Sequence, residues 1–182
     1  RYPLRPENSY LPDLDAIDPA LAQRAKCMVV SYPANPVCVA APDEFYHRLI
    51  DFARRYQIII LHDNAYSDII FDGRVGKSFL AFDGAREVGV EFNSLSKTYN
   101  LTGARVSFVL GNRDIVRCFR RLRSQIDYGA FLPVQYGAIA ALEGPQESVA
   151  RNRAEYQARR DALCGGLRRA GWDVPDSQGS MF

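Results

Sequence analysis

The chain has 182 residues, of which 47% are hydrophobic and 24% are charged, and this composition is typical of a globular protein rather than a disordered or fibrous one. Its formal net charge of +2 is too small to favour nucleic acid or an acidic surface as a partner. No apolar run approaches the roughly 20 residues that a membrane span needs. We therefore expect neither a nucleic-acid partner nor a membrane partner.

Up to Gly111 the chain alternates between short apolar runs and amphipathic segments. The apolar runs predict β-strands over 26–30, 58–61, 88–92 and 106–110, and the segment 42–56 predicts a helix that begins with Pro-Asp-Glu. Near-continuous apolar strands separated by helices are typical of a mostly parallel sheet. The sequence therefore predicts an α/β fold with helices on both faces of the sheet.

Beyond Gly111 the pattern changes to helices alone, which we predict over 114–126, 133–142 and 145–170. The last of these is long and rich in arginine, so we interpret it as a connection into a second domain. The predicted division is 1–144 as part of a large domain, and 145–182 as a connecting helix with the beginning of a smaller domain. We expect both ends of the chain to lie inside a larger protein.

The four cysteines are the only candidates for a disulfide framework or a thiolate metal site. None of them forms a Cys-x-x-Cys pair, and each lies in or beside an apolar stretch: Cys27, Cys38, Cys118 and Cys164. This pattern predicts neither a disulfide nor a metal site. Free cysteines are typical of reducing compartments, so we expect a cytoplasmic protein without a bound metal.

Polar side chains gather where the predicted strands end or begin. They are Asn35 after the first strand, Asp63 and Tyr66 after the second, Ser94, Ser96 and Lys97 after the third, and Arg105 before the fourth. In open α/β sheets, ligands bind at the carboxyl ends of the strands. We therefore expect these side chains to converge on one cleft. Asp63 and Arg105 are hard to explain as scaffold, because a charge at a buried strand end needs a partner.

This set of side chains suits pyridoxal 5'-phosphate (PLP). That cofactor needs a lysine amine, a carboxylate for its ring nitrogen, donors for its phenolate oxygen, and hydroxyl and guanidinium groups for its phosphate. The chain has only three lysines. Lys26 lies at the amino end of a predicted strand and Lys77 in a polar loop, which leaves Lys97 as the candidate for the Schiff base.

Three motifs carry a resemblance to a known family. Residues 94–105 read Ser-Leu-Ser-Lys-Thr-Tyr-Asn-Leu-Thr-Gly-Ala-Arg, and they resemble the PLP-lysine signature of the class I and II aminotransferases of fold type I. Asp63-x-x-Tyr66 and Asn35-Pro36 resemble two further motifs of that family, in the same order. Residues 127–135 and 141–144 look most like the branch of alanine/glutamate-type and LL-diaminopimelate-type enzymes. The sequence departs from the family at Val37-Cys38, usually Thr-Gly, and at Ser107, often a glycine.

The resemblance implies a role for each candidate residue. Lys97 would form the Schiff base and move the substrate's Cα proton, and Asp63 would pair with the ring nitrogen of PLP. Tyr66 and Asn35 would donate hydrogen bonds to the phenolate oxygen. The phosphate would be held by Ser94 and Arg105, with Ser96 as a third candidate. Taken alone, Asn35 also suits a turn before proline, Tyr66 a packed core, and Ser96 a local backbone cap.

For the whole molecule, the resemblance implies the large domain of a fold type I transferase followed by the start of a small α+β domain. The implied activity is transfer of an amino group between an L-amino acid and a 2-oxo acid. The implied assembly is a homodimer. The arginine that binds the substrate carboxylate in this family would lie beyond Phe182.

Three other functions remain open from the sequence. A PLP-dependent carbon–sulfur β-lyase shares the lysine and the aspartate, but such lyases typically lack an arginine where Arg105 stands. An aminotransferase-like sensing domain of a transcription regulator is compatible with the same residues. A nucleotide-binding α/β domain is disfavoured, because no glycine-rich phosphate loop follows any predicted strand.

Overall fold

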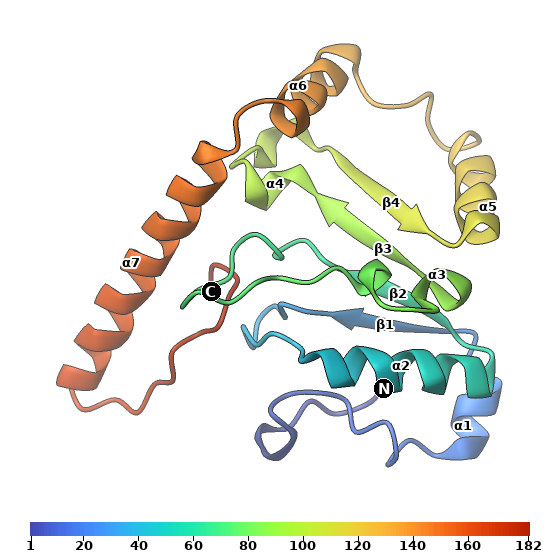
Figure 1. Cartoon of the computed structure of the whole chain (residues 1–182), viewed down its shortest axis with the longest axis horizontal. Coiled ribbons are helices and arrows are strands. Elements are labelled where there is room, and N and C mark those ends of the chain that lie inside the picture. Colours follow the sequence, from blue (N-terminus) through green and yellow to red (C-terminus); the bar gives the residue numbers. More distant parts are fainter.

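The computed structural model describes residues 1–182 and contains one four-stranded sheet in the order β1-β2-β3-β4 (Figure 1). The strands are β1 (Cys27–Ser31), β2 (Ile59–Asp63), β3 (Gly89–Ser94) and β4 (Ser107–Gly111). β1, β2 and β3 are parallel, whereas β4 is antiparallel to β3. The prediction of a mostly parallel sheet in an α/β fold is therefore confirmed.

Seven α-helices accompany the sheet. They are α1 (Pro19–Arg24), α2 (Asp43–Tyr56), α3 (Ala85–Val88), α4 (Leu95–Thr98), α5 (Arg113–Arg123), α6 (Leu132–Glu143) and α7 (Glu147–Arg169). Short 3-10 turns occur at Pro6–Asn8, Phe79–Ala81 and Thr102–Ala104. The four longer helices match the predicted ones to within a few residues. None of the helices combines the length and the apolar character needed to cross a membrane.

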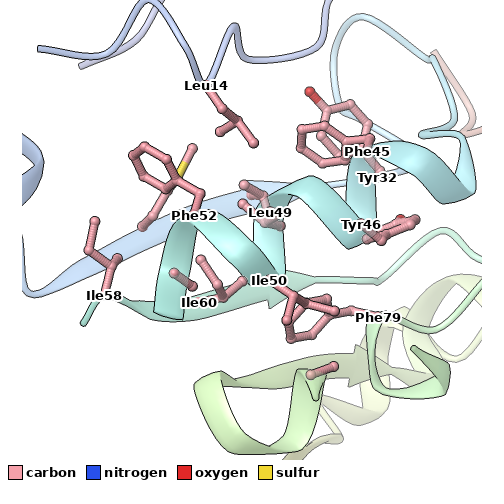
Figure 2. Close-up of a cluster of buried hydrophobic side chains, with 14 of the residues drawn as sticks. Leu14, Tyr32, Phe45, Tyr46, Leu49, Ile50, Phe52, Ile58, Ile60 and Phe79 are labelled. Atoms are coloured by element: carbon pink, nitrogen blue, oxygen red, sulfur yellow. The ribbon is translucent and has the colours of Figure 1, made fainter. Parts of the chain in front are cut away.

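The hydrophobic core lies between α2 and one face of the sheet. Phe45, Leu49 and Phe52 recur along one side of α2, as expected for an amphipathic helix. Figure 2 shows them packed with Ile60 of β2 and with Leu14 from the segment before α1. Burial of each large side chain of this kind stabilises the fold by about 1.5–3 kcal/mol. This core fixes β1 and β2, and with them the loops that follow both strands.

The opposite face of the sheet is only half covered. Helix α5 packs there against β3 and β4, where the rings of Phe92 and Phe119 lie 6.3 Å apart edge to face. Over β1 and β2 the same face is open, and Val29 keeps 59% of its surface exposed. Helices thus lie on both faces as predicted. The uncovered half leaves room for a ligand beside the ends of β2 and β3.

Each strand extends one or two residues beyond its predicted carboxyl end. β2 includes His62 and Asp63, and β3 includes Asn93 and Ser94, although the sequence pattern ends at the last apolar residue. These polar residues stay in the strands because Asp63 pairs with Phe92 and Ser94 pairs with Ser107. Their side chains are therefore positioned by the sheet itself and not by a flexible loop.

Helix α7 runs along one side of the molecule and ends before Gly171, which has a positive φ of 89° (Figure 1). Arg160 joins it to the loop after β2 by two hydrogen bonds of 2.7 Å to the carboxylate of Asp72. Gln146 accepts a hydrogen bond of 2.9 Å from Tyr99, just beyond α4. The predicted connecting helix is therefore attached to the loop that carries Tyr66 and to the segment that carries Lys97.

Candidate active site at the carboxyl edge of the sheet

A groove of about 450 Å³ lies on the open face of the sheet at the carboxyl ends of β2 and β3. It is lined by Val29, Leu61, Asp63, Ala65, Phe92, Asn93, Ser94 and Ser107. A larger hollow of about 660 Å³ lies beside the segment before α1, and none of the predicted site residues lines it. Asp63 and Ser94 are the two predicted site residues that line the smaller groove, which is therefore the candidate site, and the other five predicted residues are not part of its lining.

Asp63 places a carboxylate in this groove. As the last residue of β2 it points to the open face, so it is exposed rather than buried as the sequence suggested. Its Oδ1 accepts a hydrogen bond of 3.2 Å from the backbone N–H of Ala65. No other hydrogen bond engages this carboxylate, so Oδ2 is free to accept a hydrogen bond from a protonated nitrogen of a ligand.

Tyr66 and Asn35 meet although they belong to different loops. The Nδ2 of Asn35 donates a hydrogen bond to Tyr66 Oη over 3.3 Å, which leaves the hydroxyl proton of Tyr66 free to be donated elsewhere. Burial raises the pKa of Tyr66 above its ordinary value, the hydrogen bond from Asn35 opposes this, and the charge of Asp63 adds to the rise. Tyr66 therefore remains a neutral phenol near pH 7. Its burial alone also fits a packed core residue, but its hydroxyl accepts a hydrogen bond from Asn35, a second predicted site residue.

Lys97 lies beside Tyr66. It is the third residue of α4, the short helix that follows β3, and its side chain is half-buried. Its Nζ lies 5.8 Å from the centroid of the Tyr66 ring. A cation at that distance from an aromatic face is attracted to it. The structure thus brings Asn35 and Lys97 to Tyr66, and the Asp63 carboxylate lies close enough for its charge to raise the pKa of Tyr66.

The two serines of the lysine motif differ in their surroundings. Ser94 lines the groove, and its Oγ accepts a hydrogen bond of 3.2 Å from the N–H of Ser96, which caps α4. Ser96 is buried, and its carbonyl accepts a hydrogen bond of 3.1 Å from Thr102. The Oγ of Ser94 also donates a long hydrogen bond of 3.5 Å to the carbonyl of Val106, so a ligand in the groove would compete with that contact. The contacts of Ser96 are made within the turn.

Arg105 lies at the same edge because β4 runs antiparallel to β3. The start of β4 is beside the end of β3, where Ser107 pairs with Ser94. Arg105 is exposed, and its Nη1 donates a hydrogen bond of 3.0 Å to the carbonyl of Thr102. It contacts none of the other predicted site residues directly, and its guanidinium has further donors available for an anion.

A buried polar cluster, which the sequence analysis missed, lies behind the site on the α2 face. Glu91 contacts Nδ1 of His62 at 3.1 Å, and Asn64 Nδ2 donates to it over 3.0 Å. Burial alone would raise the pKa of Glu91, but the hydrogen bonds from His62 and Asn64 outweigh it and hold that pKa below its ordinary value. In the sequence, the only sign of this cluster was the presence of a charged residue, Glu91, inside the apolar run 88–92. Asn64 links this cluster to Asp63, its neighbour in the chain.

The arrangement suits a flat, anionic ligand with a carbonyl group. Val29, Leu61 and Ala65 give the groove an apolar floor against which a ring can pack, with the carboxylate of Asp63 at its edge. Lys97 offers a primary amine, and Tyr66 and Asn35 offer neutral donors. Ser94 and Arg105 offer the hydroxyl and guanidinium groups that suit a phosphate. The residues present therefore fit PLP.

Known proteins resemble the chain along almost its whole length. It matches the family Aminotransferase class I and II over residues 1–182. It is 47% identical to the LL-diaminopimelate aminotransferase of Halothermothrix orenii over 180 residues, which cover 99% of this chain and 46% of that protein. The chain thus spans about half the length of the curated relatives it matches.

Solved structures agree with this result. The substrate-bound BacF structure from Bacillus subtilis is 37% identical, with a TM-score of 0.93 over 99% of this chain and 46% of that one. The probable N-succinyldiaminopimelate aminotransferase of Thermus thermophilus is 33% identical, with a TM-score of 0.84 over 92% of this chain and 45% of that one. None of these proteins is named as a β-lyase, a sensing domain or a nucleotide-binding protein, so the comparisons do not support those three alternatives. The chain belongs to the class I and II aminotransferases.

Proposed function

We propose that this chain forms the cofactor-binding part of a PLP-dependent aminotransferase that moves an amino group between an L-amino acid and a 2-oxo acid. The observation that carries the proposal is that Asn35 and Lys97 both contact Tyr66, within reach of the charge of Asp63, at one edge of a mostly parallel sheet. The family match supports the same reading.

Each residue has a defined part in this proposal. Lys97 Nζ would condense with the carbonyl carbon (C4') of the cofactor with loss of water and, once displaced by substrate, would carry the proton between the substrate Cα and that C4' carbon. Asp63 would hold the proton on the ring nitrogen, and bound PLP would then draw electrons from the substrate so that its Cα–H becomes acidic. Tyr66 and Asn35 would donate hydrogen bonds to the phenolate oxygen. Ser94 and Arg105 would hold the phosphate, with Ser96 as the third candidate.

The substrate class follows from the relatives and not from the groove. Those matched here at 41–50% identity are named LL-diaminopimelate aminotransferases, which supports LL-diaminopimelate as the amino donor or product. A donor with two amino-acid ends needs a second polar contact besides the one for the reacting carboxylate. We propose a 2-oxo acid with a second carboxylate, such as 2-oxoglutarate, as its partner.

Domain organisation, assembly and location are part of the proposal as well. We retain 1–144 as part of the large domain and 145–182 as the connecting helix with the start of the small domain. We propose a homodimer, in keeping with the family resemblance. A cytoplasmic location is supported by four free cysteines, since unpaired thiols are typical of reducing compartments.

A panel of amino donors and 2-oxo acids tests the activity. We expect the full-length protein to form glutamate from LL-diaminopimelate and 2-oxoglutarate, with at least about tenfold higher kcat/KM than with alanine, because a missing polar contact costs more than a methylene group. Product formation is measured by coupled glutamate assay. Pyruvate release from cystathionine without any acceptor would instead identify a β-lyase and contradict the proposal.

A further inference from the structure

The turn that carries Lys97 is too short to hold its own position. Helix α4 has only four residues, and a single helical turn is not stable by itself in water. Within the turn, Ser94 caps the start and Thr102 holds the carbonyl of Ser96. These contacts shape the turn, but both partners belong to the same short segment. Its placement relative to the other site residues therefore depends on contacts from elsewhere.

One such contact joins the two loops that carry Lys97 and Tyr66. Thr98, the residue directly after Lys97, donates a hydrogen bond from Oγ1 to Oδ2 of Asp68 over 2.8 Å. Asp68 follows Tyr66 by two residues. Thr98 is only 8% exposed, so water competes little for the bond. A hydrogen bond to an ionised carboxylate is among the stronger kinds, and at 2.8 Å this one has the ordinary length of a hydroxyl hydrogen bond.

A second contact holds the same residue from the side of α7. Asn152 Nδ2 donates to the carbonyl of Thr98 over 3.4 Å, which is longer than the bond to Asp68. The backbone next to Lys97 is thus held on one side by the loop after β2 and on the other by α7. Beyond Cβ the Lys97 side chain makes no hydrogen bond, and its Nζ stays 5.8 Å from the centre of the Tyr66 ring. The base of the lysine is fixed while its amine can move.

From this geometry we propose that Asp68, acting through Thr98, is a positioning residue that sets the distance between Lys97 and the Tyr66 loop. The inference rests on the proposed function of Lys97. A mobile amine must reach both the cofactor and the substrate Cα, and a displacement of about 1 Å in such a group costs up to about 100-fold in rate. The Asp68–Thr98 bond prevents that displacement.

Thr98→Val tests the proposal in the full-length protein, because it removes the hydroxyl and keeps the shape of the side chain. We expect kcat to fall about 10- to 100-fold with little change in KM for the amino donor. In the cofactor-free protein, backbone amides 95–100 should exchange with deuterium about tenfold faster than in the wild type. Thr98→Ser keeps the hydroxyl and should restore slow exchange and most of the rate.

Asp68→Ala removes the same hydrogen bond from its acceptor side and should show the same losses as Thr98→Val. The test therefore does not depend on the folding of a single variant. The double variant Asp68→Ala/Thr98→Val should be no slower than either single variant, because both remove the same bond. Asp51→Ala, which removes an exposed carboxylate of α2, is the matched control. Additive losses, or wild-type exchange at 95–100 in Thr98→Val, would overturn the inference. The exchange readout needs no cofactor, so it separates this failure from a failure of the proposed function.

Discussion

Replacing Lys97 with alanine in the full-length protein should lower kcat by about 10⁴-fold or more, the upper end of what positioned acid–base groups contribute. The loss is large because the same amine is proposed both to bind the cofactor covalently and to move the Cα proton. Steady-state transamination measures it, and the visible absorbance band of lysine-bound cofactor should disappear in the same variant.

Lys77→Ala is the matched control for this experiment. Lys77 is partly exposed and pairs with Asp43 at 2.5 Å, and neither residue lines the groove. It should keep at least half of the wild-type kcat. A Lys97→Ala protein that retained a tenth of the wild-type rate would show that another amine performs the chemistry.

Asp63→Ala should keep the cofactor bound but lower kcat by about 10²- to 10³-fold, the usual cost of removing one electrostatic group that acts on the reacting centre. Without the carboxylate, nothing at the groove edge holds a proton on the ring nitrogen, so the Cα–H is less acidic. Proton removal then limits the rate more strongly. Substrate deuterated at Cα should therefore show a larger kinetic isotope effect with Asp63→Ala than with the wild type.

The control for Asp63→Ala is Asp83→Ala, since Asp83 is an exposed carboxylate in the loop before α3. It should leave both the rate and the isotope effect unchanged. An Asp63→Ala protein with wild-type kcat would contradict the role of Asp63. Loss of bound cofactor without a change in isotope effect would assign the residue to binding alone.

The larger elements of the fold could be predicted because their apolar runs and amphipathic repeats are long enough to be recognised in the sequence. Four apolar runs gave the strands, and α2 showed a full amphipathic repeat with Phe45, Leu49 and Phe52 on one side. Helices α1, α3 and α4 have only four to six residues, so they contain less than two turns of any periodic pattern. Local capping and packing decide such elements, and the sequence pattern does not reveal them.

The direction of β4 is a second feature that the sequence left undecided. Apolar runs look alike in parallel and antiparallel strands. The antiparallel pairing with β3 brings Arg105 to the same edge as Ser94, whereas a parallel β4 would have placed it at the opposite edge. Arg105 reaches the cleft from the start of a strand only because β4 is antiparallel to β3, and the sequence pattern did not reveal that direction.

Site residues were named from sequence motifs, but their mutual contacts were not. The bond between Asn35 and Tyr66 and the bond between Asp68 and Thr98 each join two loops about 30 residues apart. Such pairs depend on how the strands align, which no local pattern encodes. The buried charge of Glu91 was missed for a related reason, because its partners His62 and Asn64 come from the neighbouring strand and the loop after it.

The most direct test of the account is to find which lysine holds the cofactor. The full-length protein is reduced with borohydride, which fixes a lysine-bound cofactor, then digested, and its peptides are mapped by mass spectrometry. We expect the pyridoxyl group of PLP on Lys97 in the peptide that contains residues 94–105. Label on Lys26 or Lys77 within this chain, or no label on Lys97 in protein that holds PLP, would contradict the account.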